Sequence, residues 1–215
     1  MSTKRIDRSV YLCQTDMKIY EKTTMDKRQQ LIHSAFELFY RNGIHAVGIN
    51  QILQTAGIAK KTLYHHFASK EELIRAVVEY RDEKFYNWLA SRLEQVKPGY
   101  DGLNELFDAV DDWINNRVDL LSDFHGCFFI NTCAEFNDPQ QPIYQQCQHH
   151  KKKINSLIER QIRALGILEP ATHHVTESIS LLKEGAIVMA HVQGDLTAAN
   201  KAKDMAWIVL AAYLS

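Results

Sequence analysis

Residues 48–72, GINQILQTAGIAKKTLYHHFASKEE, decide the fold. Ile52 and Ala56 stand at helical spacing, which predicts a first short helix with one apolar face. Gly57 supplies the positive φ that a sharp turn between helices requires, and Ile58 is expected to point back inward. A second short helix follows, so the stretch predicts two short helices joined by a tight turn.

The second short helix offers only Leu63 and Phe67 to a core. Its remaining positions are cations, hydroxyls and rings, the side chains that contact phosphates and base edges. These positions are Lys60, Lys61, Thr62, Tyr64, His65 and His66. Ser69 and Glu72 have the spacing of a capping box that would open a third helix, with Lys70 in its first turn.

The same stretch resembles the DNA-binding helix-turn-helix of the TetR family of bacterial repressors. The matching residues are Ala56-Gly57-Ile58, the run from Lys60 to Phe67, and Ser69-Lys70-Glu71-Glu72-Leu73, in register near the N-terminus. The resemblance implies a homodimer that binds a palindromic double-stranded DNA operator and pairs through its last helices. It also implies that the second short helix is the reading helix, which enters the DNA groove. A small-molecule inducer would shift the helix that follows it, and repression is the usual mode.

Side-chain chemistry indicates individual DNA contacts. Lys60 and Lys61 can donate to guanine, and Tyr64 can reach a thymine methyl or a phosphate. Asn50 and Gln51 begin the preceding helix, where an amide can address a purine edge. The resemblance implies base contacts at Asn50, Lys60, Lys61, Tyr64 and His65. It implies phosphate contacts at Thr62, His66 and Lys70.

Three departures from the family pattern leave the operator sequence open. Many relatives have Ser or Thr where this chain has Ala59, and a hydroxyl residue where it has Gly48 or Ile49. A helix cap and a phosphate contact are therefore expected to be missing. Consecutive Lys60 and Lys61 also replace a common Lys-Gly pair.

The composition is that of a globular chain, with 46% apolar and 24% charged residues among 215. No apolar run approaches the roughly 20 residues that span a bilayer, and the N-terminus lacks the apolar segment of a signal peptide. We therefore expect a cytoplasmic protein without membrane contact. Residues 1–97 hold 16 Lys and Arg against 11 Asp and Glu, whereas residues 98–215 hold 9 against 15. A basic first part suits a polyanionic partner.

Helical periodicity continues along the chain, which predicts an all-α fold. Residues 1–24 are expected to be a flexible extension, with a helical extension or a DNA-touching arm as alternatives. Residues 25–70 would form a three-helix DNA-binding domain, and residues 71–215 a ligand-binding and dimerisation domain. The expected helices outside the opening stretch are Thr24 to Arg41, Ser69 to Val96 ending at Pro98-Gly99, one containing Leu103 to Ile114, Cys127 to Phe136, Gln141 to Leu165, Ala171 to Gln193 and Thr197 to Leu214.

The last two helices carry apolar stripes that could pair two subunits as a four-helix bundle. Gly185 would let a second backbone come close. The alternative is that both helices fill a monomer core. The stripes are Val175, Ile179, Leu182, Ala186, Met189 and Gln193 on one helix, and Ala202, Met205, Ile208, Val209 and Ala212 on the other.

An apolar set with a few polar ends is expected to line the ligand site, although each member could equally be core. The set is Trp88, Trp113, Phe129, Cys133, Tyr144 and His191. Cys127 could instead sense electrophiles or oxidants, since His125 lies two residues away and some similar regulators have a Gly-Cys here. The alternative is a small buried thiol.

Two other classes of function compete with the regulator. An enzyme is not favoured, because the chain has no Gly-x-Ser-x-Gly, no phosphate loop and no Glu-x-x-His. A helical interaction module that binds no DNA is the other. No cofactor or metal site is expected: the cysteines form no Cys-x-x-Cys pair, and the adjacent histidines lack metal-ligand spacing.

Overall fold

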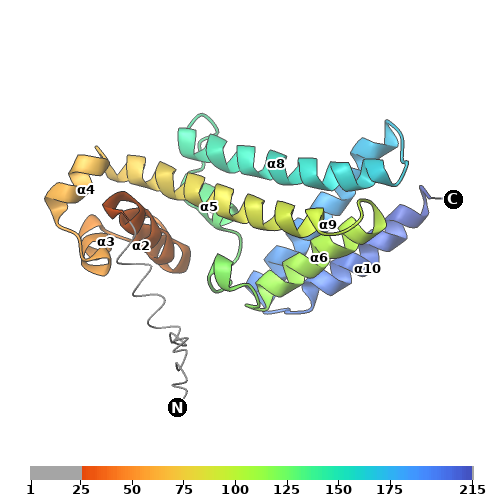
Figure 1. Cartoon of the computed structure of the whole chain (residues 1–215), viewed down its shortest axis with the longest axis horizontal. Coiled ribbons are helices and arrows are strands. Elements are labelled where there is room, and N and C mark those ends of the chain that lie inside the picture. The colour runs from red at the N-terminus through yellow and green to blue at the C-terminus, as the bar shows by residue number, and fades with distance from the viewer. Residues whose placement is uncertain (1–25, 215) are drawn as a thin grey trace, which may run out of the picture.

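The computed structural model describes residues 26–214. This part of the chain is built from helices without a strand, which confirms the predicted all-α class. Figure 1 shows α2, α3 and α4 gathered at one end of the long helix α5, with the later helices along and beyond its other end. The helices are α2 (Lys27–Asn42), α3 (Ile49–Ala56), α4 (Lys60–His66), α5 (Lys70–Glu94), α6 (Tyr100–Ile114), the short 3-10 helix η1 (Asp119–Leu121), α7 (Phe128–Glu135), α8 (Pro142–Ala164), α9 (Ala171–Gln193) and α10 (Ala198–Ala211). The predicted extension, residues 1–24, lies outside the described residues.

Helix α2 begins later than predicted. Asp26, not Thr24, is its N-cap, and the Asp26 carboxylate accepts the backbone N–H groups of Arg28 and Gln29. A carboxylate is a strong cap because it satisfies free N–H groups and also faces the positive end of the helix dipole. The predicted end at Asn42-Gly43 is confirmed, with Gly43 at φ 84°.

The tight turn between α3 and α4 forms as expected. Gly57 is left-handed (φ 67°, ψ 34°) and donates its N–H to the carbonyls at the end of α3. Leu63 and Phe67 are both buried, and so is Ile58. The Gln30 side chain of α2 donates to the carbonyl of Ala56 at 2.7 Å. These contacts fix α4 against the other two helices.

Helix α5 is 25 residues long and opens with Ser69 as its N-cap. The Ser69 hydroxyl accepts the Glu72 N–H, and the Glu72 carboxylate accepts the N–H of Ala68 rather than that of Ser69. The reciprocal cap is thus displaced by one residue from the ideal box. The predicted apolar residues of α5 are all buried: Leu73, Ile74, Val77, Phe85, Trp88 and Leu89. They pack on both parts of the molecule, because α5 contacts α2 on one side and α6 and α8 on the other.

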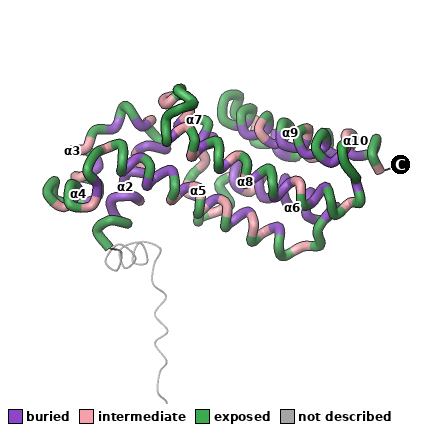
Figure 2. Tube along the Cα trace, turned by 90° about the horizontal axis from the view of Figure 1, so that it is seen from above, coloured by how far each residue is buried: buried purple, intermediate pink, exposed green. Residues whose placement is uncertain are grey.

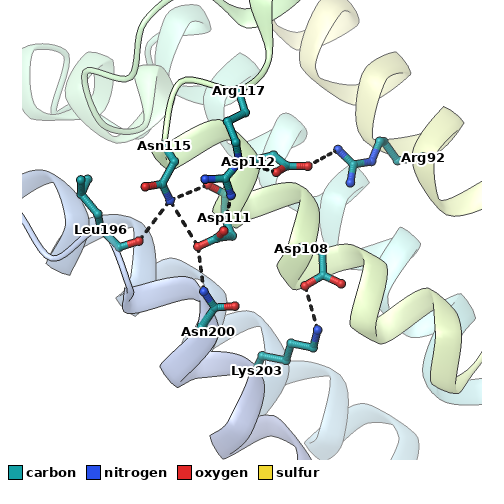
Figure 3. Close-up of polar contacts among 9 residues, drawn as sticks. All are labelled: Arg92, Asp108, Asp111, Asp112, Asn115, Arg117, Leu196, Asn200 and Lys203. Atoms are coloured by element: carbon teal, nitrogen blue, oxygen red, sulfur yellow. Dashed lines mark hydrogen bonds and ion pairs between the residues drawn. The ribbon is translucent and has the colours of Figure 1, made fainter.

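The helices from α5 to α10 form the larger part of the molecule. There, carboxylates of α6 bind side chains of α5, of α10 and of the residue Arg117 that follows α6 (Figure 3). Asp112 accepts from Arg92 of α5 and from Arg117, each at 2.8 Å. Asp108 pairs with Lys203 of α10 at 2.7 Å. Because α10 also packs along α9, these contacts make α6, α9 and α10 one layer beside α5 and α8.

The predicted pairing stripe on α9 is wrong in part. Val175, Ile179 and Ala186 are buried within the protomer and cannot meet a second subunit. The exposed apolar residues of α9 are Leu181, Val188 and Val192, together with Met189 of the predicted stripe. Figure 2 shows α9 with buried and exposed positions alternating along its length. A Cβ on Gly185 would meet open space. Helix α9 is apolar on two sides, so periodicity alone could not tell the inner side from the outer one.

On α10, Met205 and Ile208 are exposed as expected, whereas Ala202 is buried. Within the described residues, no helix combines the length and apolar character needed to cross a membrane.

Candidate nucleic-acid interface and interior cavity

Helix α4 presents a polar surface. Lys60, Lys61, Tyr64 and His65 are exposed, because Leu63 takes the only fully buried position of this helix. The Lys60 ammonium lies 6.0 Å from the centre of the Tyr64 ring, so a cation and a ring are offered together. This arrangement can meet both a phosphate and a base edge.

The N-termini of α3 and α4 carry no side-chain cap. Gly48 and Ala59 are the two N-cap residues, and neither supplies a side-chain hydrogen bond. This agrees with the predicted loss of a cap at both positions. Asn50 and Gln51 are exposed in the first turn of α3, and the free N–H groups beside them favour an anion such as a phosphate.

Three of the predicted phosphate-binding residues are only partly exposed. Thr62 and His66 are half-buried on the side of α4 nearer the core. Lys70 donates to the carbonyl of Ile44 at 2.8 Å, and burial lowers its pKa. An ammonium has three donors, so Lys70 retains two for a phosphate, but its position is fixed by the protein.

The larger part of the molecule encloses a small cavity of about 10 Å³. Its walls come from α5, α6, α7, α8 and α9. The lining residues are Arg81, Phe85, Trp113, Cys127, Phe128, Phe129, His150, Lys151, Lys183 and Ile187. Aromatic rings and three cations therefore face one enclosed space.

Arg81 is the most unusual of these residues, since it is only 1% exposed. Its Nη1 donates to the carbonyl of Leu121 at 2.9 Å, whereas Nε and Nη2 have no hydrogen-bond partner among the described residues. The guanidinium lies 5.2 Å from the centre of the Phe36 ring and 5.3 Å from that of Tyr40, both on α2. Burial lowers the pKa of Arg81.

A second charged group of the cavity contains two lysines and one carboxylate. Lys151 and Lys183 each contact Glu184 at 2.6 Å, and Lys151 also donates to the Cys127 sulfur at 3.3 Å. Burial alone would raise the pKa of Glu184, but the two lysines outweigh it and bring the pKa to about 2. Burial lowers the pKa of Lys183. The cluster thus holds more cationic groups than carboxylates.

His150 connects the cavity to α5. Its ring is stacked on Phe129 with centres 3.5 Å apart, and its Nδ1 lies 2.7 Å from the Asp82 carboxylate. Lys153 shares that carboxylate at 2.8 Å. Burial lowers the pKa of His150 to about 4, against the opposing effect of Asp82.

The predicted ligand residues do not form one site. Trp113 lines the cavity, and Phe129 lines both the cavity and a neighbouring open groove of about 280 Å³. Cys133 and Tyr144 line that groove and not the cavity, as do Ile130, Cys147 and Gln148, whereas Lys151 lines both. Trp88 packs against Phe85, and His191 lies beside Phe124 and Gly126.

Cys133 and Cys147 face each other across the groove. The Cys147 thiol donates a hydrogen bond to Cys133, and this bond lowers the pKa of Cys133 to about 7. The same bond raises the pKa of Cys147. Metal ligation is a separate matter: the described residues contain no cluster of three or more His, Cys, Asp or Glu that could hold a metal ion.

The loop before α7 contacts α2. The Tyr40 hydroxyl donates to the carbonyl of Gly126 at 2.6 Å and accepts the N–H of His125. Ser122 donates to Glu37 at 2.7 Å. A movement of the backbone around Cys127 would therefore alter the contacts of α2.

Sequence reasoning missed Arg81, Lys151, Lys183 and Glu184 as a group. A signal was present for Arg81, which falls at core spacing between Val77 and Phe85. A charged residue at an apolar-face position is costly unless paired, so such positions mark candidate sites. Lys183 lies four residues after Ile179 in the same way.

Residues 31–77 match the family described as "Bacterial regulatory proteins, tetR family". The chain is 24% identical over 176 residues to the HTH-type transcriptional regulator LmrA of Bacillus subtilis, covering 81% of this chain and 89% of LmrA. It is 32% identical over 91 residues to the HTH-type transcriptional activator FasR of Mycolicibacterium smegmatis, covering 42% of each. The fold is similar to that of SCO4454, a TetR-family transcriptional regulator from Streptomyces coelicolor, with a TM-score of 0.77, 24% identity, and coverage of 88% of this chain and 96% of that one.

Proposed function

We propose that the chain is a regulator of the TetR type, and that it is a homodimeric, ligand-released repressor of a palindromic operator. The observation that carries the proposal is the exposed row on α4, where Lys60, Lys61, Tyr64 and His65 point away from a fixed three-helix core. Residues 25–70 would be the DNA-binding domain, and residues 71–215 the ligand-binding and dimerisation domain.

The reading helix would enter the major groove with its first turn. Lys60 and Lys61 would donate to guanine or phosphate, and Tyr64 and His65 would face base edges. Asn50 and Gln51 would reach the groove edge from α3. Thr62, His66 and Lys70 would hold phosphates. Repression is our proposal rather than a property of all relatives, since FasR is named as an activator.

The second subunit would cover the outer side of α9 and α10. Leu181 and Val192 are 74% and 73% exposed, and Ile208 of α10 is 64% exposed. Neighbouring exposed apolar residues of this kind mark an association surface. Open space at Gly185 would admit a second backbone, so that two helices from each subunit form a four-helix bundle.

The test is selection of bound fragments from the parent genome, followed by gel shifts at several salt concentrations. We expect salt-sensitive binding to a palindrome, because cationic contacts release counterions from DNA. The double variant Lys60→Ala/Tyr64→Ala should abolish specific binding and leave the dimer intact. Lys152→Ala, at an exposed position of α8, is the matched control and should bind normally.

Binding by the double variant at wild-type strength would contradict the assignment of the reading helix. Failure to select any fragment would instead favour the helical interaction module.

A thiol sensor is the second candidate function. Lys151 donates to the Cys127 sulfur at 3.3 Å, so this thiol is in direct contact with a cation. Modification at this crowded site would push α7 and α8 apart and release the operator. Treatment with an electrophile should then modify Cys127 and weaken DNA binding. Unmodified Cys127 together with unchanged DNA affinity would rule this candidate out.

A further inference from the structure

We propose that the interior cavity binds the acid group of an organic anion whose body is aromatic. The proposal deepens the proposed function, since this anion would be the inducer. The binding itself depends only on the residues around the cavity and can be measured without DNA.

The first argument is the balance of charge. Arg81, Lys151 and Lys183 line the cavity, and within residues 26–214 the only carboxylate that pairs with any of them is Glu184. Asp82 does not line the cavity, and His150 and Lys153 share it. Unpaired buried charge is costly, so a site with this excess of cations favours an anion.

The second argument is the free hydrogen-bonding capacity of buried donors. Nε and Nη2 of Arg81 have no hydrogen-bond partner among the described residues. Both atoms belong to a residue that lines the cavity and is only 1% exposed. Rings surround the Arg81 guanidinium, and no oxygen of the described residues accepts from these N–H groups. A carboxylate, with two oxygens, could accept two donors of one guanidinium.

The third argument concerns the rest of the ligand. Phe85, Trp113 and Phe129 present aromatic surface to the cavity, and Ile187 closes it from α9. Such walls favour a flat apolar body beside the acid group. Sugars and other polyols would leave hydroxyls against these rings without partners.

The fourth argument concerns entry. A void of about 10 Å³ holds no organic molecule, so binding requires movement. Phe129 and Lys151 separate the cavity from the open groove of about 280 Å³ and line both. Rotation of Phe129 away from His150 would join the two spaces. The acid group would then meet the cations while the aromatic body occupies the position that Phe129 leaves.

Binding there would change the contacts that the cavity residues make with α2 and with α5. The Arg81 guanidinium contacts the Phe36 and Tyr40 rings of α2 and would turn toward the anion. Loss of the stack between Phe129 and His150 would loosen the contact of His150 with Asp82 of α5. Both α2 and α5 flank the reading helix, so the ligand would change its position.

The experiment measures binding to the purified full chain by calorimetry and thermal shift, without DNA. The probes are benzoate, phenylacetate and naphthoate, each compared with its neutral amide. We expect at least one acid to bind and to raise the melting temperature, and its amide to bind far more weakly. Equal binding of an acid and its amide, or no binding by any of the three acids, would overturn the proposal.

Variants locate the site. Lys183→Met and Lys151→Met should each weaken binding of the acid by about tenfold to a hundredfold, the usual value of a charge-assisted hydrogen bond. Glu184 keeps one lysine partner in either variant, so the fold should survive, and circular dichroism checks this. Lys153→Met is the matched control, since Lys153 is on α8 but pairs with Asp82 outside the cavity. An equal loss in the control would place the site elsewhere and overturn the assignment.

Gel shifts then separate this inference from the proposed function. Binding of an acid with release of the operator supports both. Binding of an acid to a chain that binds no DNA supports the cavity assignment and contradicts the repressor. Binding without release of a bound operator supports the site and contradicts the inducer role.

Discussion

The carboxylate of Glu135 accepts the backbone N–H of Ile44 at 2.7 Å, which joins the end of α7 to the loop between α2 and α3. The same carboxylate accepts the N–H of His45 at 2.6 Å and lies 3.1 Å from the His45 ring. Lys70 donates to the carbonyl of Ile44 from the other side. The loop that leads into α3 is therefore fixed by contacts with α7 and with the start of α5.

Glu135→Ala should lower the free energy of unfolding by about 1–3 kcal/mol, because it leaves two N–H groups of this loop without their acceptor. It should also weaken the effect of a ligand on DNA binding. Urea denaturation and gel shifts with ligand measure the two effects. Glu94→Ala, at an exposed position of α5, is the control. Equal stability of the two variants would show that the Glu135 contact is unimportant in solution.

Val192→Glu should convert the proposed dimer to monomers, because a charge would be buried where α9 meets its copy. Sedimentation velocity measures the change. Leu120→Glu also introduces a carboxylate at an exposed apolar position, in η1, and should leave the dimer unchanged. A dimeric Val192→Glu protein would require another pairing surface.

The stability of the protein should fall between about pH 6.5 and pH 4 because of His150. Its folded pKa of about 4 is below the unfolded value, so the neutral ring stabilises the fold above pH 6.5. This stability is lost as the pH falls through 4, and it amounts to about 3 kcal/mol for this residue. Denaturation across this range should show a flatter pH dependence in His150→Asn. The exposed neighbour gives the control, His149→Asn, which should keep the wild-type slope.

Cys133 should be the fastest cysteine to alkylate among the described residues. Its thiol is half-exposed in the groove, and the hydrogen bond from Cys147 lowers its pKa to about 7. The rate of reaction with iodoacetamide should rise through neutral pH, and Cys133→Ser should remove the fast phase. Cys147→Ser should slow Cys133 by restoring an ordinary pKa. An unchanged rate in that variant would contradict the proposed contact.

Much of the fold was predictable because local signals agreed with one another. Gly57 predicted the end of α3, the Ser69 cap predicted the start of α5, and the apolar spacing predicted the buried residues of α5. The structure has all three features. The N-terminus of α2 was misplaced because Thr24 and Asp26 are both good caps. The choice between them depends on where the first turn packs, which the sequence does not show.

The interior site was less predictable for a physical reason. Phe129 and Trp113 could be chosen as aromatic wall residues, but the cavity depends on Arg81 and Lys183, which a hydrophobicity pattern treats as interruptions. Their partners come from other helices, so burial of these charges is a tertiary property. His191 and Trp88 were selected by residue type, yet they face other surroundings.

Helix α5 has one more consequence. Its 25 residues contain neither Gly nor Pro, so it should behave as a stiff rod about 37 Å long. A tilt of only about 5° at one end of such a rod displaces the other end by about 3 Å, close to the rise of one base pair. A side-chain movement no larger than the turning of Phe129 could therefore put the two α4 helices of the proposed dimer out of step with successive turns of DNA.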